Sequence, residues 1–131
     1  MQDRPTALEL LDAVRAFLED EVVPALAGRR RFHARVAANL LAIVGRELAG
    51  EELALGAEWA SLVSLLGRPP GAPPAGRQAL AAAVRQATAE LGERIRRGQA
   101  DAGPFADAVR AHVRRTVRAK LAVANPRQLV V

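Results

Sequence analysis

The chain has 131 residues, of which half are hydrophobic and a quarter charged, and its formal net charge is +5. This length and composition exclude a disordered chain and fit a single domain whose core needs no disulfide or structural metal. Cysteine is absent, which excludes thiolate metal sites and thiol nucleophiles and favours the cytoplasm. Aromatic residues make up only 3%, so the core must come from Leu, Val and Ala, which favours helices.

The N-terminal segment has acidic residues within its apolar part and lacks the basic start and the cleavage site of a signal peptide, so we expect no export. The apolar runs are much shorter than the roughly 18 residues that a membrane-spanning helix needs, so we expect no span. The positive charge is weak evidence for nucleic-acid binding. Every basic residue except Lys120 is Arg and Ala is abundant, as GC-rich coding would also produce.

The first predicted helix begins at Thr6-Ala7-Leu8-Glu9, which has the pattern of a capping box. Apolar residues then recur at three- and four-residue spacing to about Leu26. We expect Pro24 to bend the last turn and Gly28 to supply the left-handed position that ends the helix.

The second predicted helix starts near Arg30 and continues through Gly50 to Leu66, with a kink at Gly50 as the alternative. Its first half groups apolar residues on one face, namely Phe32, Val36, Leu40, Ile43 and Val44. Its second half groups Trp59, Leu62, Val63 and Leu66. Each group predicts a buried side.

Residues 67–76 contain four of the eight prolines, which predicts a surface loop between two helical hairpins. A docking segment for a Pro-binding domain is the alternative. A third helix is predicted over Arg77–Arg97, with the apolar stripe Leu80, Val84, Ala87, Leu91 and Ile95. A fourth helix should open at Gly103-Pro104 and run to about Ala124, before Asn125-Pro126 and the apolar tail Leu129-Val130-Val131.

No strand-like alternation competes with these helices. We therefore predict an all-α fold over residues 1–131, a four-helix bundle of up-down topology with a long, continuous or kinked second helix.

Polar residues occur on faces that should be buried. On a wheel of the fourth helix, Phe105, Val109, Val113, Val117 and Val123 define the inner side, and His112, Thr116 and Lys120 lie within it. On the second helix Glu47 falls among the apolar residues, His33 shares their face and Asn39 flanks it. We expect Glu47, or Glu21, to compensate Lys120 or a flanking Arg.

Two interpretations of these polar residues stay open, a sealed ion-pair network that fixes helix register and a ligand site. A small anion is the ligand that their charges favour. The candidate residues are His33, Arg35, Asn39, Arg46, Glu47, His112, Lys120 and Asn125.

Catalytic and metal signatures are not found in the sequence. His33 and His112 have no Glu-x-x-His or His-x-x-x-His spacing and no third ligand, so we expect structural roles, no metal and no cofactor. Ser61 and Ser64 have no His nearby in the sequence and no Gly-x-Ser-x-Gly motif, which speaks against a nucleophilic triad.

Two basic clusters remain, Arg29-Arg30-Arg31 at a turn and Arg110, Arg114 and Arg118 on the fourth helix. A solvated face is the expectation for both, because the polar and aromatic base contacts of a nucleic-acid surface are absent.

Four segments carry a family likeness that spans nearly the whole chain. They are Met1-Gln2-Asp3-Arg4-Pro5-Thr6, Phe32-His33-Ala34-Arg35-Val36-Ala37-Ala38-Asn39, Arg46-Glu47 and Lys120-Leu121-Ala122-Val123-Ala124-Asn125-Pro126. Together they resemble a bacterial domain-of-unknown-function family. The resemblance implies a small protein encoded beside or fused to an aminoglycoside-phosphotransferase-like kinase, often near acyl-CoA dehydrogenases, and carries no assigned catalytic residue.

We therefore expect a non-catalytic accessory domain that binds such a kinase through an exposed apolar or Arg-rich helix face, with self-association left open. One alternative is a small-molecule module that binds an anion or acyl group at the polar residues of the second and fourth helices. A basic nucleic-acid-binding protein is the other alternative, and steep salt dependence would be required for it.

Overall fold

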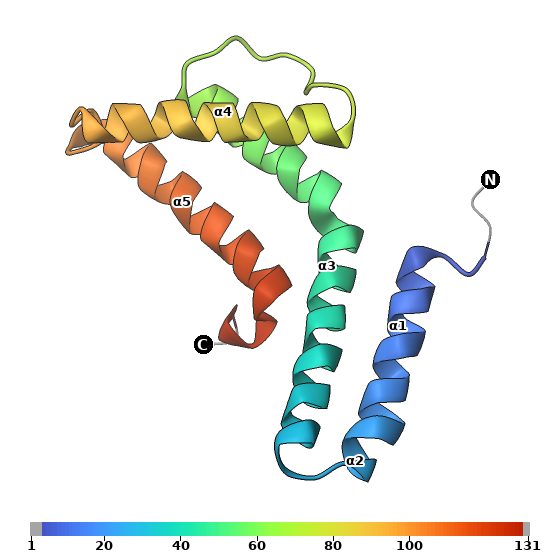
Figure 1. The fold of residues 1–131 in the computed structure, drawn as a ribbon. Coiled ribbons are helices and arrows are strands. Elements are labelled where there is room, and N and C mark those ends of the chain that lie inside the picture. The colour runs from blue at the N-terminus through green and yellow to red at the C-terminus, as the bar shows by residue number, and fades with distance from the viewer. Residues whose placement is uncertain (1–3, 130–131) are drawn as a thin grey trace. The chain divides into compact units, whose positions relative to one another are not determined.

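The computed structural model describes residues 4–129, and this part of the chain is helical without any strand. Its four long helices are α1 (Ala7–Phe17), α3 (Gly28–Leu65), α4 (Arg77–Arg96) and α5 (Gly103–Ala124) (Figure 1). The predicted all-α class and its four principal helices are confirmed. Met1–Asp3 of the first family-like segment and Val130 and Val131 of the predicted tail lie outside the described residues.

The capping box at the start of α1 is confirmed. The Thr6 side chain accepts a hydrogen bond from the Glu9 backbone N at 3.3 Å, and the Glu9 carboxylate accepts from the Thr6 backbone N at 2.7 Å. After α1 the chain makes one π-helical turn, η1 (Leu18–Val22), and ends in the short α2 (Val23–Ala25). The widened turn has a local cause, because Pro24 has no N–H to donate and its ring crowds the carbonyl four residues earlier.

Helix α3 runs without interruption from Gly28 to Leu65, so the predicted continuation through Gly50 is confirmed. Gly28 adopts a φ of +56°, so its predicted left-handed conformation is confirmed, but the preceding helix ends at Ala25 and Gly28 is the first residue of α3. Gly50 is an ordinary helical residue, and a Cβ added there would meet nothing within 4 Å.

The chain divides into two compact units, and the division falls after Gly50, within α3. Unit 1 comprises the residues up to Gly50 together with Val123–Asn125, and unit 2 comprises Glu51–Ala122 and the residues from Pro126 onward. The organisation of residues 1–131 as a single domain stays a prediction.

Unit 2 holds a hydrophobic core to which three helices contribute. Its buried members are Leu62 and Leu66, Leu80, Val84, Ala87 and Leu91, and Val109, and the partly buried Trp59 and Phe105 pack against them. The predicted stripe of the third helix is therefore confirmed as far as Leu91, whereas Ile95 is 40% exposed. Residues 67–76, between α3 and α4, form neither helix nor strand.

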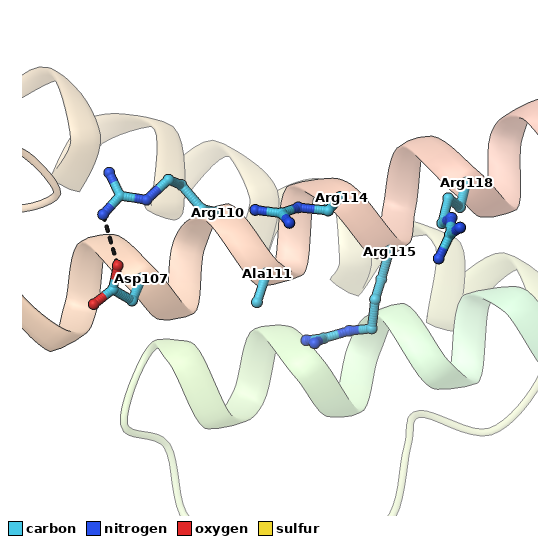
Figure 2. A pocket seen from close by; sticks show the side chains of 6 residues that line it. All are labelled: Asp107, Arg110, Ala111, Arg114, Arg115 and Arg118. Carbon is cyan, nitrogen blue, oxygen red and sulfur yellow. Dashed lines mark hydrogen bonds and ion pairs between the residues drawn. The ribbon is translucent and has the colours of Figure 1, made fainter. Parts of the chain in front are cut away.

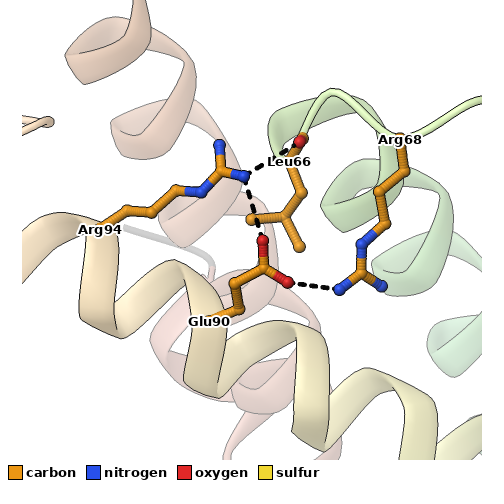
Figure 3. Close-up of polar contacts among 4 residues, drawn as sticks. All are labelled: Leu66, Arg68, Glu90 and Arg94. Carbon is orange, nitrogen blue, oxygen red and sulfur yellow. Dashed lines mark hydrogen bonds and ion pairs between the residues drawn. The ribbon is translucent and has the colours of Figure 1, made fainter.

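A polar network joins the end of α3 to α4 in unit 2 (Figure 3). Arg94 donates to the backbone carbonyl of Leu66 at 3.2 Å and to the Glu90 carboxylate at 3.0 Å. Glu90 also accepts from Arg68, the second residue of the 67–76 loop. The network satisfies a carbonyl that the end of a helix leaves without a partner and fixes the start of the loop.

Unit 1 has a much smaller core. Among its described residues the buried hydrophobic ones are Val23 and Ala38, and α1 has none. Helix α1 and the first half of α3 lie side by side (Figure 1), and together they line a cleft of about 420 Å³. Its lining on α3 includes the half-buried residues Leu41, Ala42, Gly45 and Arg46.

Candidate functional site

The first half of α3 exposes an apolar stripe, which we call the α3 face. Every fourth residue belongs to it, namely Phe32, Val36, Leu40, Val44 and Leu48, with exposed fractions of 63, 39, 55, 42 and 47%. Small residues occupy the opposite side of the helix, where Ala38 is buried and Ala34, Ala42 and Gly45 are half-buried. The predicted group shares four residues with this face, but it included Ile43, which is half-buried, and left out Leu48. The prediction that this side of the helix is buried is wrong, because the shared residues are exposed.

Helix α1 exposes a second apolar stripe, the α1 face, formed by Leu10, Val14 and Phe17. Each of these side chains is more than half exposed, at 52, 51 and 53%. The exposed acids Asp20 and Glu21 lie a few residues further along the chain, within the π-helical turn. An amphipathic helix with an open apolar side and an acidic border is typical of a helix that docks on another protein.

The polar residues predicted on α3 share the exposure of the α3 face. His33, Arg35, Asn39 and Glu47 are all exposed, so the prediction that Glu47 turns inward is wrong. A helix wheel shows which residues share a side of α3, but that side is buried only where a neighbouring element packs on it. In unit 1 the Ala-rich side of α3 is the side that is packed. His33 Nε2 accepts a hydrogen bond from Arg29 Nε at 3.2 Å.

Arg46 is the predicted residue of unit 1 with a clear structural role. Its side chain is half-buried, and its Nε donates to the Val123 carbonyl oxygen at 2.7 Å. Val123 lies one residue before the end of α5, where helical carbonyls have no partner within the helix, so Arg46 caps this end. Asn125 directly follows α5 and is exposed.

On α5 the predicted inner side is buried only in its first half. Ala106, Val109 and His112 are buried, whereas Val113 and Val117 are 47 and 48% exposed. Lys120 is exposed, and the prediction that it turns inward is wrong because unit 2 does not cover the second half of this side. Glu47 belongs to unit 1 and Lys120 to unit 2. Compensation of Lys120 by Glu47 or Glu21 stays a prediction.

His112 is the predicted residue that the structure does bury, with 4% exposure. Its Nδ1 lies 2.8 Å from the Oγ of Ser61, and that oxygen also accepts from Arg115 at 2.9 Å. Burial lowers the pKa of His112, and Arg115 lowers it further, whereas Glu58 opposes the shift. The imidazole is therefore kept neutral, and a neutral Nδ1 can accept the hydroxyl proton of Ser61.

The sequence analysis set Ser61 aside because no His is near it in the sequence, but its partner His112 lies 51 positions away. The pair has the distance of a nucleophile and its base, but within the described residues no carboxylate is hydrogen-bonded to His112 to complete a triad. The observed arrangement links α3 to α5.

Arginine side chains gather along α5 around a cleft that we call the Arg cleft (Figure 2). The row of Arg110, Arg114 and Arg118 in it was predicted from the sequence. A shallow cleft of about 450 Å³ is lined by Asp107, Arg110, Ala111, Arg114, Arg115 and Arg118. Asp107 pairs with Arg110 at 2.7 Å, while Arg114 and Arg118 form no ion pair with any residue between Glu51 and Leu129 that the structure describes in unit 2. Excess guanidinium groups around one cleft favour binding of an anion.

The described residues offer neither a cluster of metal ligands nor a membrane-spanning helix. Residues 4–129 contain no group of three or more His, Asp or Glu side chains that could hold a metal ion. In the same part of the chain, no helix has both the length and the apolar character needed to cross a membrane.

Comparison with curated proteins and with solved structures found no significant match. A family model does match the chain, over residues 24–128. The match includes all of α3, α4 and α5, and therefore the α3 face, His112 and the Arg cleft. The chain thus belongs to the family described as a domain of unknown function, DUF6285.

Proposed function

We propose that this protein is an accessory domain that binds a partner protein through the α1 face. The partner we propose is an aminoglycoside-phosphotransferase-like kinase in acyl-CoA-related metabolism, as the family resemblance implies, and the place of action is the cytoplasm. One observation carries the proposal. Leu10, Val14 and Phe17 present a continuous apolar stripe of which each side chain is more than half exposed.

The energetics favour a partner on this stripe. Burying a Val, Leu or Phe side chain stabilises an assembly by roughly 1.5–3 kcal/mol when the side chain starts fully exposed, and these three start about half exposed. The side chains of α1 contribute little to the stability of unit 1, because no residue of α1 is buried. The apolar side chains of α1 therefore contribute more in a complex than in the isolated chain.

The charge around the α1 face indicates which kind of partner surface would bind this face. The segment from Arg4 to Val22 has two Arg and five acids, which are Glu9, Asp12, Glu19, Asp20 and Glu21. Arg15 is held by Asp12 at 3.4 Å and by Glu19 at 2.9 Å. We therefore propose that the kinase offers an apolar groove with a basic border, which an acidic amphipathic helix complements.

The test is co-purification with an aminoglycoside-phosphotransferase-like kinase from the same organism, expressed together with tagged versions of this chain. The wild-type chain should retain the kinase, and a Val14→Ser/Phe17→Ser variant should lose it. Leu53→Ser is the matched control, because Leu53 is 83% exposed but lies outside the α1 face. Equal retention by the wild type and the double variant, or no retention by the wild type, would overturn the proposal.

The Arg cleft favours a second function, binding of a small anion such as the phosphates of an acyl-CoA. Arg114 and Arg118 form no ion pair among the described residues of unit 2 and border the same cleft as Arg115. A thermal-shift series with coenzyme A and inorganic phosphate tests it, because ligand at about 100 times its Kd stabilises by about 2.7 kcal/mol. The shift should vanish in Arg114→Ala/Arg118→Ala, and a shift that persists in that variant would exclude this site.

A further inference from the structure

Arg115 belongs to two features of unit 2 at once. Its side chain lines the Arg cleft, and it also donates a hydrogen bond to the Oγ of Ser61 at 2.9 Å. Figure 2 shows this side chain reaching from α5 towards α3, the helix that carries Ser61. Ser61 in turn lies 2.8 Å from the Nδ1 of the buried His112. Two short contacts therefore lead from the cleft to the imidazole.

The charge of Arg115 is available to a ligand in the cleft. Its hydrogen-bond partner is a neutral hydroxyl, and among the described residues of unit 2 it forms no ion pair. Arg115 is exposed, and Arg118 lies three residues further along α5, so the two side chains are neighbours on the helix surface. An anion held by Arg118 in this cleft therefore lies beside Arg115 as well.

Two charged groups, one on each neighbouring helix, act on His112. Burial lowers the pKa of His112, Glu58 on α3 raises it, and Arg115 on α5 lowers it. A protonated Nδ1 would donate to the Oγ of Ser61, which already accepts from Arg115. Two cations would then converge on one hydroxyl oxygen. The free-energy cost of protonating His112 therefore depends on how far the charge of Arg115 is compensated.

We infer that anion binding in the Arg cleft is coupled through Arg115 to the protonation of His112, so that the protein takes up a proton together with its ligand. The ligand class is a doubly charged oxyanion, such as a phosphate group. Its negative charge offsets the repulsion between Arg115 and a protonated His112. The coupling is reciprocal, so protonation of His112 strengthens anion binding by the same factor.

This inference rests on the second proposed function, anion binding in the Arg cleft, and adds its regulation by pH. Acid should therefore favour ligand binding, although it destabilises the chain without ligand. Sulfate is the suitable probe, because its double negative charge does not change over the pH range in which histidine titrates, whereas phosphate itself gains a proton there.

NMR titration of the His112 imidazole tests the coupling. The chain has two histidines, so a His33→Gln background leaves His112 as the only imidazole signal. Titrations between about pH 4.5 and 8 compare sulfate with chloride at equal ionic strength. Saturating sulfate should raise the pKa of His112 by about 0.5 or more, which corresponds to about threefold tighter sulfate binding by the protonated protein.

Two variants in the same background separate the coupling from general electrostatics. Arg115→Gln should retain part of the sulfate binding, through Arg114 and Arg118, but the pKa of His112 should no longer respond. Arg85→Gln is the matched control, because Arg85 is an exposed arginine of unit 2 that does not line the cleft. This control should keep both the binding and the change in pKa.

The backbone amide signals of α5 report sulfate binding independently of the imidazole. Sulfate binding that leaves the pKa of His112 unchanged would overturn the coupling but not anion binding. A change in pKa that persists in Arg115→Gln would also overturn only the coupling. Amide signals of α5 that do not respond to sulfate would overturn the coupling together with the proposed anion binding.

Discussion

The Nδ1 of His112 lies 2.8 Å from the Oγ of Ser61 and so joins α5 to α3 within unit 2. Arg115 donates to the same hydroxyl oxygen, and the hydroxyl proton can then be donated to an unprotonated Nδ1 of His112. Burial lowers the pKa of His112 and so favours the neutral form of this histidine. Its consequences can be measured through the stability of the protein.

Acidification should destabilise the protein through His112. Burial lowers the pKa of the folded-state imidazole below its ordinary value of 6.5, so the unfolded chain binds the proton more readily. This part of the stability is present above pH 6.5 and is lost as the pH falls from there towards the lower folded-state pKa. Urea unfolding at pH 7.5 and 5.0 should show a smaller loss for His112→Gln than for the wild type. An equal loss in both would count against this role of His112.

Removal of the Ser61 hydroxyl should leave two partners unsatisfied. Ser61→Ala deprives His112 Nδ1 and Arg115 of their shared hydrogen-bond partner, which should lower the free energy of unfolding by about 1–3 kcal/mol. The control is Ser64→Ala, because Ser64 is exposed and its replacement should change stability by no more than about 0.5 kcal/mol. Urea titrations of both variants at pH 7.5 provide the comparison, and equal effects would contradict the role given to Ser61.

The Glu90 network should stabilise unit 2 only while Glu90 is ionised. The hydrogen bond from Arg68 lowers the pKa of Glu90 below its ordinary value of 4.5, with a further contribution from Arg94. Its contribution to stability is therefore present above pH 4.5 and is lost as the pH falls through the lower folded-state value. Glu90→Gln should reduce the urea midpoint at pH 7 and converge with the wild type in acid. A gap that stays constant down to pH 3 would exclude this mechanism.

Two glycines of α3 should respond in opposite ways to replacement by alanine. Gly50 is helical and a Cβ there would meet nothing within 4 Å, so Gly50→Ala should stabilise the protein by about 0.5–1 kcal/mol. Gly28 has a φ of +56°, where an alanine side chain is strained, so Gly28→Ala should destabilise it. Thermal unfolding measures both, and a loss of stability in Gly50→Ala would show that this glycine has a role beyond the helix.

Much of the fold could be predicted from local signals. The capping box at Thr6 and Glu9, the positive φ of Gly28 and the stripe from Leu80 to Leu91 depend on residues a few positions apart, and all three were predicted correctly. The π-helical turn before Pro24 was expected only as a bend. A helix can accommodate the missing amide hydrogen of Pro24 either by bending or by a π-helical turn, and the sequence does not distinguish between the two.

The candidate site was predicted only in part, because burial depends on which elements meet. The sequence placed Glu47 with the apolar residues of α3 and Lys120 with those of α5, and these groupings match the exposed faces. It could not show that unit 1 packs α3 through its alanines rather than through Phe32 and Leu40. The Ser61–His112 contact could likewise not be predicted, because it joins residues on two different helices that lie far apart in the sequence.

Hydrogen–deuterium exchange of this protein with and without the aminoglycoside-phosphotransferase-like kinase tests the proposed binding most directly. Exchange should slow over residues 7–22 when the kinase is added, because a docked helix opens less often to solvent. The slowing should be absent in Val14→Ser/Phe17→Ser and present in Leu53→Ser. No slowing over residues 7–22 at saturating kinase, or slowing confined to α5, would contradict binding through the α1 face.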